Sequence, residues 1–144
     1  MSEDTASVAV EAIERTLEIA ASPDRVWEAL TDPAELAAWF PERVDGLEAT
    51  AEGEGWLVWD GHGRYAIRME AFEPRTRLVW RWARESETAL ADGPTTTVEW
   101  RLESDGAGGT ILRLREDGFL TTAARGQNSA GWERELGELT TYLA

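Results

Sequence analysis

Apolar and polar residues alternate along most of the chain, with the period that is typical of half-buried β-strands. The first such segment covers residues 8–20, in which Ile13, Leu17 and Ile19 share a face with Arg15. Further segments with strand character follow at 43–50, 55–60, 64–74, 77–85, 95–103 and 110–117. The weakest is 43–50, which contains a glycine. The pattern predicts a sheet built from most of the chain.

The last four of these segments each have one apolar and one charged face. In 64–74 the predicted inward side chains are Tyr65, Ile67, Met69 and Ala71. The outward positions of the four segments carry mainly Arg and Glu, so we expect ion pairs between neighbouring strands. This pattern indicates an antiparallel meander with one face in water.

Two short helices are predicted between the first strand and the meander. Ser22-Pro23 and Asp32-Pro33 each combine a capping side chain with a proline in the first helical turn, and Pro41 ends the second helix. These signals place one helix after Ser22 and a second after Asp32, joined by a tight turn.

A longer helix is predicted at the C-terminal end of the sequence. Trp132, Leu136, Leu139 and Leu143 are spaced as one apolar stripe. Gly126 and Gly131 weaken the preceding turns, so we expect the stable helix to begin near residue 129. A half-solvated antiparallel sheet must bury its other face, and this helix is the long amphipathic element available to cover it. The predicted fold class is α+β.

Composition narrows the classes of partner. The 144 residues hold 28 acidic residues and 14 basic ones, which gives a net charge of −14. Such a chain is a poor partner for nucleic acid or an anionic membrane surface. All of the basic residues are arginine, which indicates a genome rich in G and C. The sequence contains no cysteine, and eight of its aromatic residues are tryptophan.

Organisation and location follow from the same composition. The length predicts a single domain over 7–144 after a frayed terminus at 1–6. We find no signal peptide and no apolar run long enough to span a membrane, so a cytoplasmic protein is expected.

The order of elements, with its motifs, resembles the helix-grip fold of the START-like (SRPBCC, birch-pollen-allergen-like) superfamily. Within that superfamily it resembles the family related to the activator of the heat-shock protein 90 ATPase, and in particular its small bacterial members. The segments that carry the resemblance are SPDRVWEALTDPAELAAWF (22–40), GHGR with FEPRTRLVWRW (within 61–82), REDGF (115–119) and GWERELGELTTYL (131–143).

The resemblance implies a curved antiparallel sheet wrapped on the long helix, with a hydrophobic cavity between them. In the superfamily this cavity binds lipids, polyketides, hormones or other apolar molecules. From the inward positions we expect these ligand-binding residues: Tyr65, Met69, Trp80, Trp100, Leu114, Glu116, Phe119, Trp132 and Leu136. We expect the mouth near Phe119. Whether the tryptophans leave a cavity or fill the core stays open.

Glu116 and Arg15 are the charged residues with inward parity. In the helix-grip topology their two strands are neighbours, so the side chains could meet, and a buried carboxylate needs such a partner. The alternative is that the last strand twists or ends before residue 116 and leaves Glu116 in water. Both interpretations stay open from the sequence.

Candidate catalytic groups are few. The single histidine, His62, lies between two glycines at a predicted hairpin tip, with Asp60 two residues away. A catalytic histidine needs a nucleophile or a carboxylate held beside it, so we interpret His62 as a turn residue. No nucleophile elbow, phosphate-binding loop or metal-loop spacing occurs in the sequence. We therefore expect no cofactor and no metal site.

Three hypotheses about function follow, in order of preference. The first is a binding protein for a small apolar or aromatic ligand. The second is a chaperone-associated interaction module, with a filled core and an exposed apolar patch near Trp39, Phe40, Trp56 or Trp59. The third is a cyclase or hydrolase that uses the same cavity, with Tyr65, Arg15 and Glu116 as its polar groups. The expected partners are a small apolar ligand and a possible chaperone contact, in a monomer or homodimer.

Overall fold

The computed structural model describes residues 10–144. The predicted frayed terminus at 1–6 and the first residues of the predicted strand 8–20 lie outside the described residues. The elements in chain order are β1 (Ile13–Ile19), α2 (Pro23–Thr31), α3 (Pro33–Trp39), β2 (Arg43–Asp45), β3 (Glu54–Trp59), β4 (Gly63–Glu73), β5 (Arg77–Ala83), η1 (Leu90–Asp92), β6 (Thr95–Ser104), β7 (Thr110–Asp117) and α4 (Thr122–Leu143).

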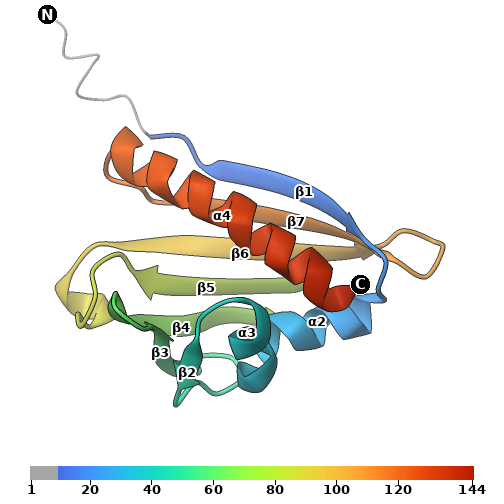
Figure 1. The fold of residues 1–144 in the computed structure, drawn as a ribbon, viewed down its shortest axis with the longest axis horizontal. Coiled ribbons are helices and arrows are strands. Elements are labelled where there is room, and N and C mark those ends of the chain that lie inside the picture. The colour runs from blue at the N-terminus through green and yellow to red at the C-terminus, as the bar shows by residue number, and fades with distance from the viewer. Residues whose placement is uncertain (1–9) are drawn as a thin grey trace, which may run out of the picture.

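All seven strands form one antiparallel sheet in the order β1-β7-β6-β5-β4-β3-β2. The helix α4 lies across one face of this sheet (Figure 1). The helices α2 and α3 lie beside the C-terminal end of α4. The α+β helix-grip architecture expected from the sequence is confirmed. No helix in the described range is both long and apolar enough to cross a membrane.

The two short helices begin where the capping signals place them. The Ser22 hydroxyl accepts a hydrogen bond from the Arg25 amide at 3.2 Å. The Asp32 carboxylate accepts from the Ala34 and Glu35 amides at 2.8 and 3.3 Å. Each cap satisfies amide groups that the first helical turn leaves without an intrahelical partner.

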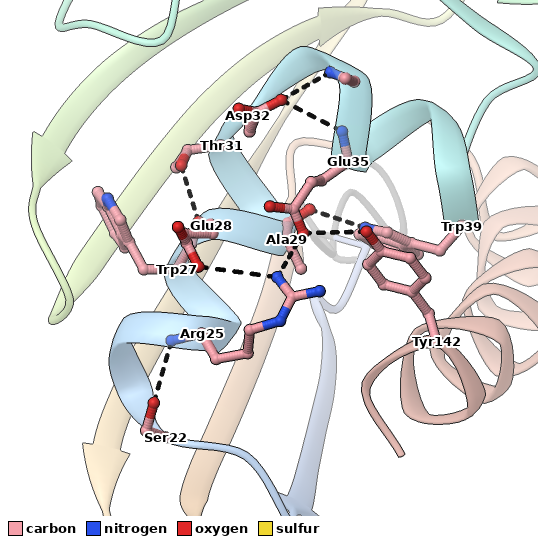
Figure 2. Close-up of polar contacts among 11 residues, drawn as sticks. Ser22, Arg25, Trp27, Glu28, Ala29, Thr31, Asp32, Glu35, Trp39 and Tyr142 are labelled. Atoms are coloured by element: carbon pink, nitrogen blue, oxygen red, sulfur yellow. Dashed lines mark hydrogen bonds and ion pairs between the residues drawn. The ribbon is translucent and has the colours of Figure 1, made fainter.

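Polar contacts join these helices to the end of α4 (Figure 2). The Tyr142 hydroxyl donates to the Glu35 carboxylate at 3.0 Å, and Arg25 donates to the same oxygen. The Arg25 guanidinium also lies 5.4 Å from the centre of the Tyr142 ring. Trp39 donates its indole N–H to the Ala29 carbonyl at 2.8 Å, which holds α3 against α2.

The sheet face turned away from α4 carries ion pairs between strands, as the alternation predicts. Glu99 accepts from Arg77 at 2.7 Å, and the Arg81–Glu70 pair has a separation of 3.0 Å. Burial raises the pKa of Glu99, but hydrogen bonds from Arg77 and Arg101 outweigh this and hold it below its usual value.

Three sequence predictions are corrected, two about where an element begins or ends and one about which side chains face inward. The predicted strand 43–50 is only β2, because the backbone turns at Gly46 with a φ of 69°. The helix α4 begins at Thr122 rather than near 129, because the Thr121 hydroxyl caps it by accepting from the Ala124 amide at 3.0 Å. A bulge after Met69 reverses the parity of β4, so Phe72 rather than Ala71 shares the inward face.

Candidate functional site

The inward face of the sheet is covered by an aromatic cluster centred on Phe40, the residue after α3. The Phe40 ring lies 5.5 Å from Trp132 on α4, 5.7 Å from Trp82 on β5 and 5.4 Å from Trp59 on β3, centre to centre. Such separations are typical of packed aromatic pairs. The cluster therefore joins the end of α3 to α4 and to the strands β3 and β5.

The middle of the space between sheet and helix is filled. Trp80 and Trp100 have no solvent exposure, and their rings lie 5.7 Å apart. The Trp100 ring also meets Trp132 edge to face at 5.4 Å. The indole N–H groups of Trp80 and Trp100 are buried and have no hydrogen-bond acceptor among residues 10–144. Aromatic packing rather than a cavity occupies the centre of the fold.

A pocket remains at one end of the cluster, beside the N-terminal half of α4. It has a volume of about 320 Å³. We call it the aromatic pocket and define it by these lining residues: Phe40, Trp59, Tyr65, Trp82, Ala83, Arg84, Gln127, Asn128, Gly131, Trp132, Arg134 and Glu135. Its volume is at the lower end of the range for small-molecule sites, which combine apolar walls with a few polar groups.

Glu116 lies behind the aromatic wall of this pocket and has no solvent exposure. Its carboxylate accepts hydrogen bonds from the indole N–H groups of Trp82 and Trp132 at 2.9 and 2.7 Å. It also accepts from the Thr96 hydroxyl at 2.6 Å and from the Asn128 amide at 3.0 and 3.1 Å. A buried carboxylate needs such compensation, and here the donors orient two tryptophan walls of the pocket.

Neither open interpretation of Glu116 is correct. The strand β7 continues to Asp117, so Glu116 stays on the inward face instead of reaching water. Arg15 does not supply its partner, because the Arg15 guanidinium donates to the Ser129 hydroxyl at 2.6 Å and to the Glu14 carbonyl at 2.9 Å. Neutral donors from four side chains take the role expected of a cation.

Arg84 places a positive charge in the wall of the aromatic pocket. It follows β5 directly, its amide donates to the Pro94 carbonyl at 2.9 Å, and its guanidinium lies 5.2 Å from the centre of the Trp82 ring. One N–H group donates to the Asn128 carbonyl oxygen at 2.7 Å. Burial lowers the pKa of Arg84, and the charge of Glu116 opposes that shift.

Two further charged residues line the pocket rim. The Arg134 guanidinium lies 3.4 Å from the Glu135 carboxylate. The Arg134 side chain is 71% exposed and that of Glu135 only 14%. Burial raises the pKa of Glu135, and Arg134 opposes this shift. The rim is therefore close to neutral, whereas Arg84 lies further in.

The structure separates the predicted site residues into two groups. Tyr65 and Trp132 line the aromatic pocket, and Glu116 contacts its wall from behind. The other predicted residues are buried in the core and do not line it: Met69, Trp80, Trp100, Leu114, Phe119 and Leu136. The aromatic packing fills their part of the inward face, so the pocket lies beside β3–β5, and Phe119 is not at its mouth.

Sequence reasoning missed several lining residues. Trp82 had the correct inward parity, and its position at the end of β5 was the available signal. Phe40 directly precedes the helix-ending Pro41, and only the tertiary packing brings its ring to the sheet. Arg84 and Asn128 lie outside the apolar patterns of their elements, so no periodicity in the sequence marks them.

The exposed apolar patch expected of an interaction module is not found at the predicted tryptophans. Trp39 and Phe40 are buried, whereas Trp56 and Trp59 are half-buried. Within residues 10–144, Leu120 is the one large apolar side chain that is exposed, at 76%. A larger hollow of about 570 Å³ lies over β3 and β4 beside η1, but Trp56 is its only aromatic lining residue.

Comparison with known proteins finds a matching family and solved structures with a similar fold. The family described as activator of Hsp90 ATPase homolog 1-like protein matches residues 20–144. The crystal structure of DynU16, a protein in the dynemicin biosynthetic locus, is 29% identical over 92% of this chain with a TM-score of 0.77. This chain covers 47% of DynU16 and therefore spans about half its length.

Two further structures match over nearly their full length. Protein MLL2253 from Mesorhizobium loti is 23% identical with a TM-score of 0.80, over 92% of this chain and 96% of that one. The Aha1 dimer from Colwellia psychrerythraea is 20% identical with a TM-score of 0.76, over 92% and 95%. Both show likeness of fold. Comparison with curated protein sequences finds no match.

Proposed function

The chain belongs to the family of activator of Hsp90 ATPase homolog 1-like proteins, and from this membership we propose that its aromatic pocket binds a small apolar or aromatic ligand. The observation that carries the proposal is the pocket of about 320 Å³ at the end of an otherwise filled aromatic core. Aromatic walls with a few oriented polar groups are the usual composition of a small-molecule site.

The position of the pocket supports the proposal. Its walls come from α3, β3, β4, β5 and α4, so packing of the whole fold holds them in place. The hydrogen bonds from Trp82 and Trp132 to Glu116 fix two of these walls before a ligand arrives. Such preorganisation reduces the entropy cost of binding.

Gly131 on α4 offers a direct test. It lines the pocket, and a Cβ added there meets no other atom within 4 Å. We expect Gly131→Leu to occupy the pocket and to weaken ligand binding by about tenfold or more. The same change should stabilise the fold by about 0.5–1 kcal/mol, because glycine is a poor helix former.

Gly126 is the matched control for this variant. It lies on the same helix, also has open space at its Cβ position, and does not line the pocket. Quenching of tryptophan fluorescence by a panel of fatty acids, flavonoids and naphthalene derivatives measures binding. We expect Gly126→Leu to bind like the unaltered protein. If no compound binds, or if both variants bind equally well, the proposed function is wrong.

A further inference from the structure

The aromatic pocket contains hydrogen-bond donors that the described part of the chain does not fully use. Arg84 donates to Asn128, and within residues 10–144 it forms no ion pair. Its remaining N–H groups are not sealed in the core. Tyr65 also lines the pocket, and its hydroxyl makes no hydrogen bond to the described part of the chain. Arg84 and Tyr65 therefore have free capacity to donate.

Glu116 does not accept hydrogen bonds from Arg84 or from Tyr65. Its two oxygens already accept from Trp82, Trp132, Thr96 and Asn128, and the Asn128 amide stands between it and Arg84. The nitrogen of Asn128 faces Glu116 and its oxygen faces Arg84. Asn128 thus holds the guanidinium in place while keeping the two charges apart.

The geometry also argues against a cationic ligand. Aromatic faces attract cations, but here the Arg84 guanidinium already lies 5.2 Å from the Trp82 ring centre. A second cation in the pocket would meet the charge of Arg84, and the one acidic lining residue, Glu135, is already paired with Arg134. The ligand that complements Arg84 and the aromatic walls is therefore an anion with a planar, apolar body.

We propose that the ligand is an aromatic carboxylate, whose carboxylate binds to Arg84 and the Tyr65 hydroxyl while its ring lies among Phe40, Trp59 and Trp132. This inference rests on the proposed function and adds the charge of the ligand. Arginine is suited to the task because its planar N–H groups match the two oxygens of a carboxylate.

Two probes of nearly equal shape test the charge. The first is 2-naphthoate and the second is the neutral 2-naphthamide, both titrated against tryptophan fluorescence near neutral pH. We expect the unaltered protein to bind 2-naphthoate about tenfold or more tightly than 2-naphthamide, because hydrogen bonds between charged groups are the stronger ones. This comparison needs no variant and therefore does not depend on how a variant folds.

Arg84→Gln tests the assignment to a residue. Glutamine lacks the positive charge of arginine, so we expect the preference for naphthoate over naphthamide to disappear. Arg113→Gln is the matched control, because Arg113 pairs with Glu103 at the surface and does not line the aromatic pocket. It should keep the preference, since exposed charges contribute little.

The possible outcomes separate the two proposals. Equal binding of both probes overturns the aromatic carboxylate and leaves the ligand pocket standing. A preference for naphthoate that survives Arg84→Gln overturns the role of Arg84. Failure of both probes and of the wider panel overturns the proposed function, and the carboxylate with it.

Discussion

Glu116 is the residue whose environment the sequence least foretold. A carboxylate without solvent exposure is costly unless its oxygens are hydrogen-bonded. Here the indole N–H groups of two large tryptophans supply much of that compensation. The consequence is mutual dependence, because without the carboxylate the buried N–H group of Trp132 would lose its acceptor and that of Trp82 would keep only the Thr96 hydroxyl.

We expect Glu116→Gln to lower the free energy of unfolding by about 2–4 kcal/mol. The glutamine NH₂ group would face donors where the carboxylate accepts, so at least one buried N–H group would lose its acceptor. Chemical denaturation measures the change. Glu103→Gln is the control, since Glu103 pairs with Arg113 at the surface, and it should cost less than about 0.5 kcal/mol. Equal stability of both variants would contradict this account.

At the scale of elements, the contact between α2, α3 and α4 closes one end of the fold. Arg25 and Tyr142 both donate to Glu35, which makes this carboxylate the common point of three helices (Figure 2). The buried stripe of α4 covers the sheet, while Tyr142 connects the last turn of the same helix to α3. The short helices are therefore anchored by both packing and hydrogen bonds.

Removing the Tyr142 hydroxyl should weaken this connection. We expect Tyr142→Phe to cost about 0.5–1.5 kcal/mol of unfolding free energy, because it removes the 3.0 Å hydrogen bond to Glu35 and leaves the ring in place. Tyr65→Phe is the same chemical change at a hydroxyl without a protein partner in residues 10–144, so it should cost less. Thermal or denaturant unfolding compares them, and a larger loss for Tyr65→Phe would refute the interpretation.

The elements show where sequence patterns succeed and where they do not. Alternation identified the long strands because each has one buried and one solvated face, and the proline-containing caps located α2 and α3. The helix α4 starts earlier than its glycines indicate, because the Thr121 hydroxyl caps its first turn. The pocket could not be predicted because its position depends on where the side-chain packing ends. Alternation along a strand indicates which residues face inward, but it does not indicate how completely their side chains fill the space.

At the scale of the whole molecule, the net charge is negative, and the basic residues of the outer sheet face are paired with acidic ones. The face of the sheet away from α4 alternates Arg with Glu and Asp in paired contacts, and the total charge is −14. Phosphate backbones are bound by clusters of unpaired basic residues. The paired arginines of this face do not form such a cluster.

We therefore expect no binding to DNA or RNA. In a gel-shift assay at physiological salt, the protein should leave both a duplex and a single-stranded probe unshifted at micromolar concentration, whereas a basic control protein shifts them. A salt-dependent shift at these concentrations would show that the ion pairs on the sheet open to phosphate, contrary to this prediction.

The pairing of β1 with β7 has a consequence for how the chain acquires its shape during synthesis. Strands β2 to β7 each pair with a neighbour along the chain, but β1 pairs with the last strand, with Ile13 opposite Glu116. As the chain leaves the ribosome, β1 emerges before the other strands and has no partner until β7 emerges. Contacts between such distant segments are slow to form. We expect the nascent chain to hold an incomplete sheet until the residues of β7 are released.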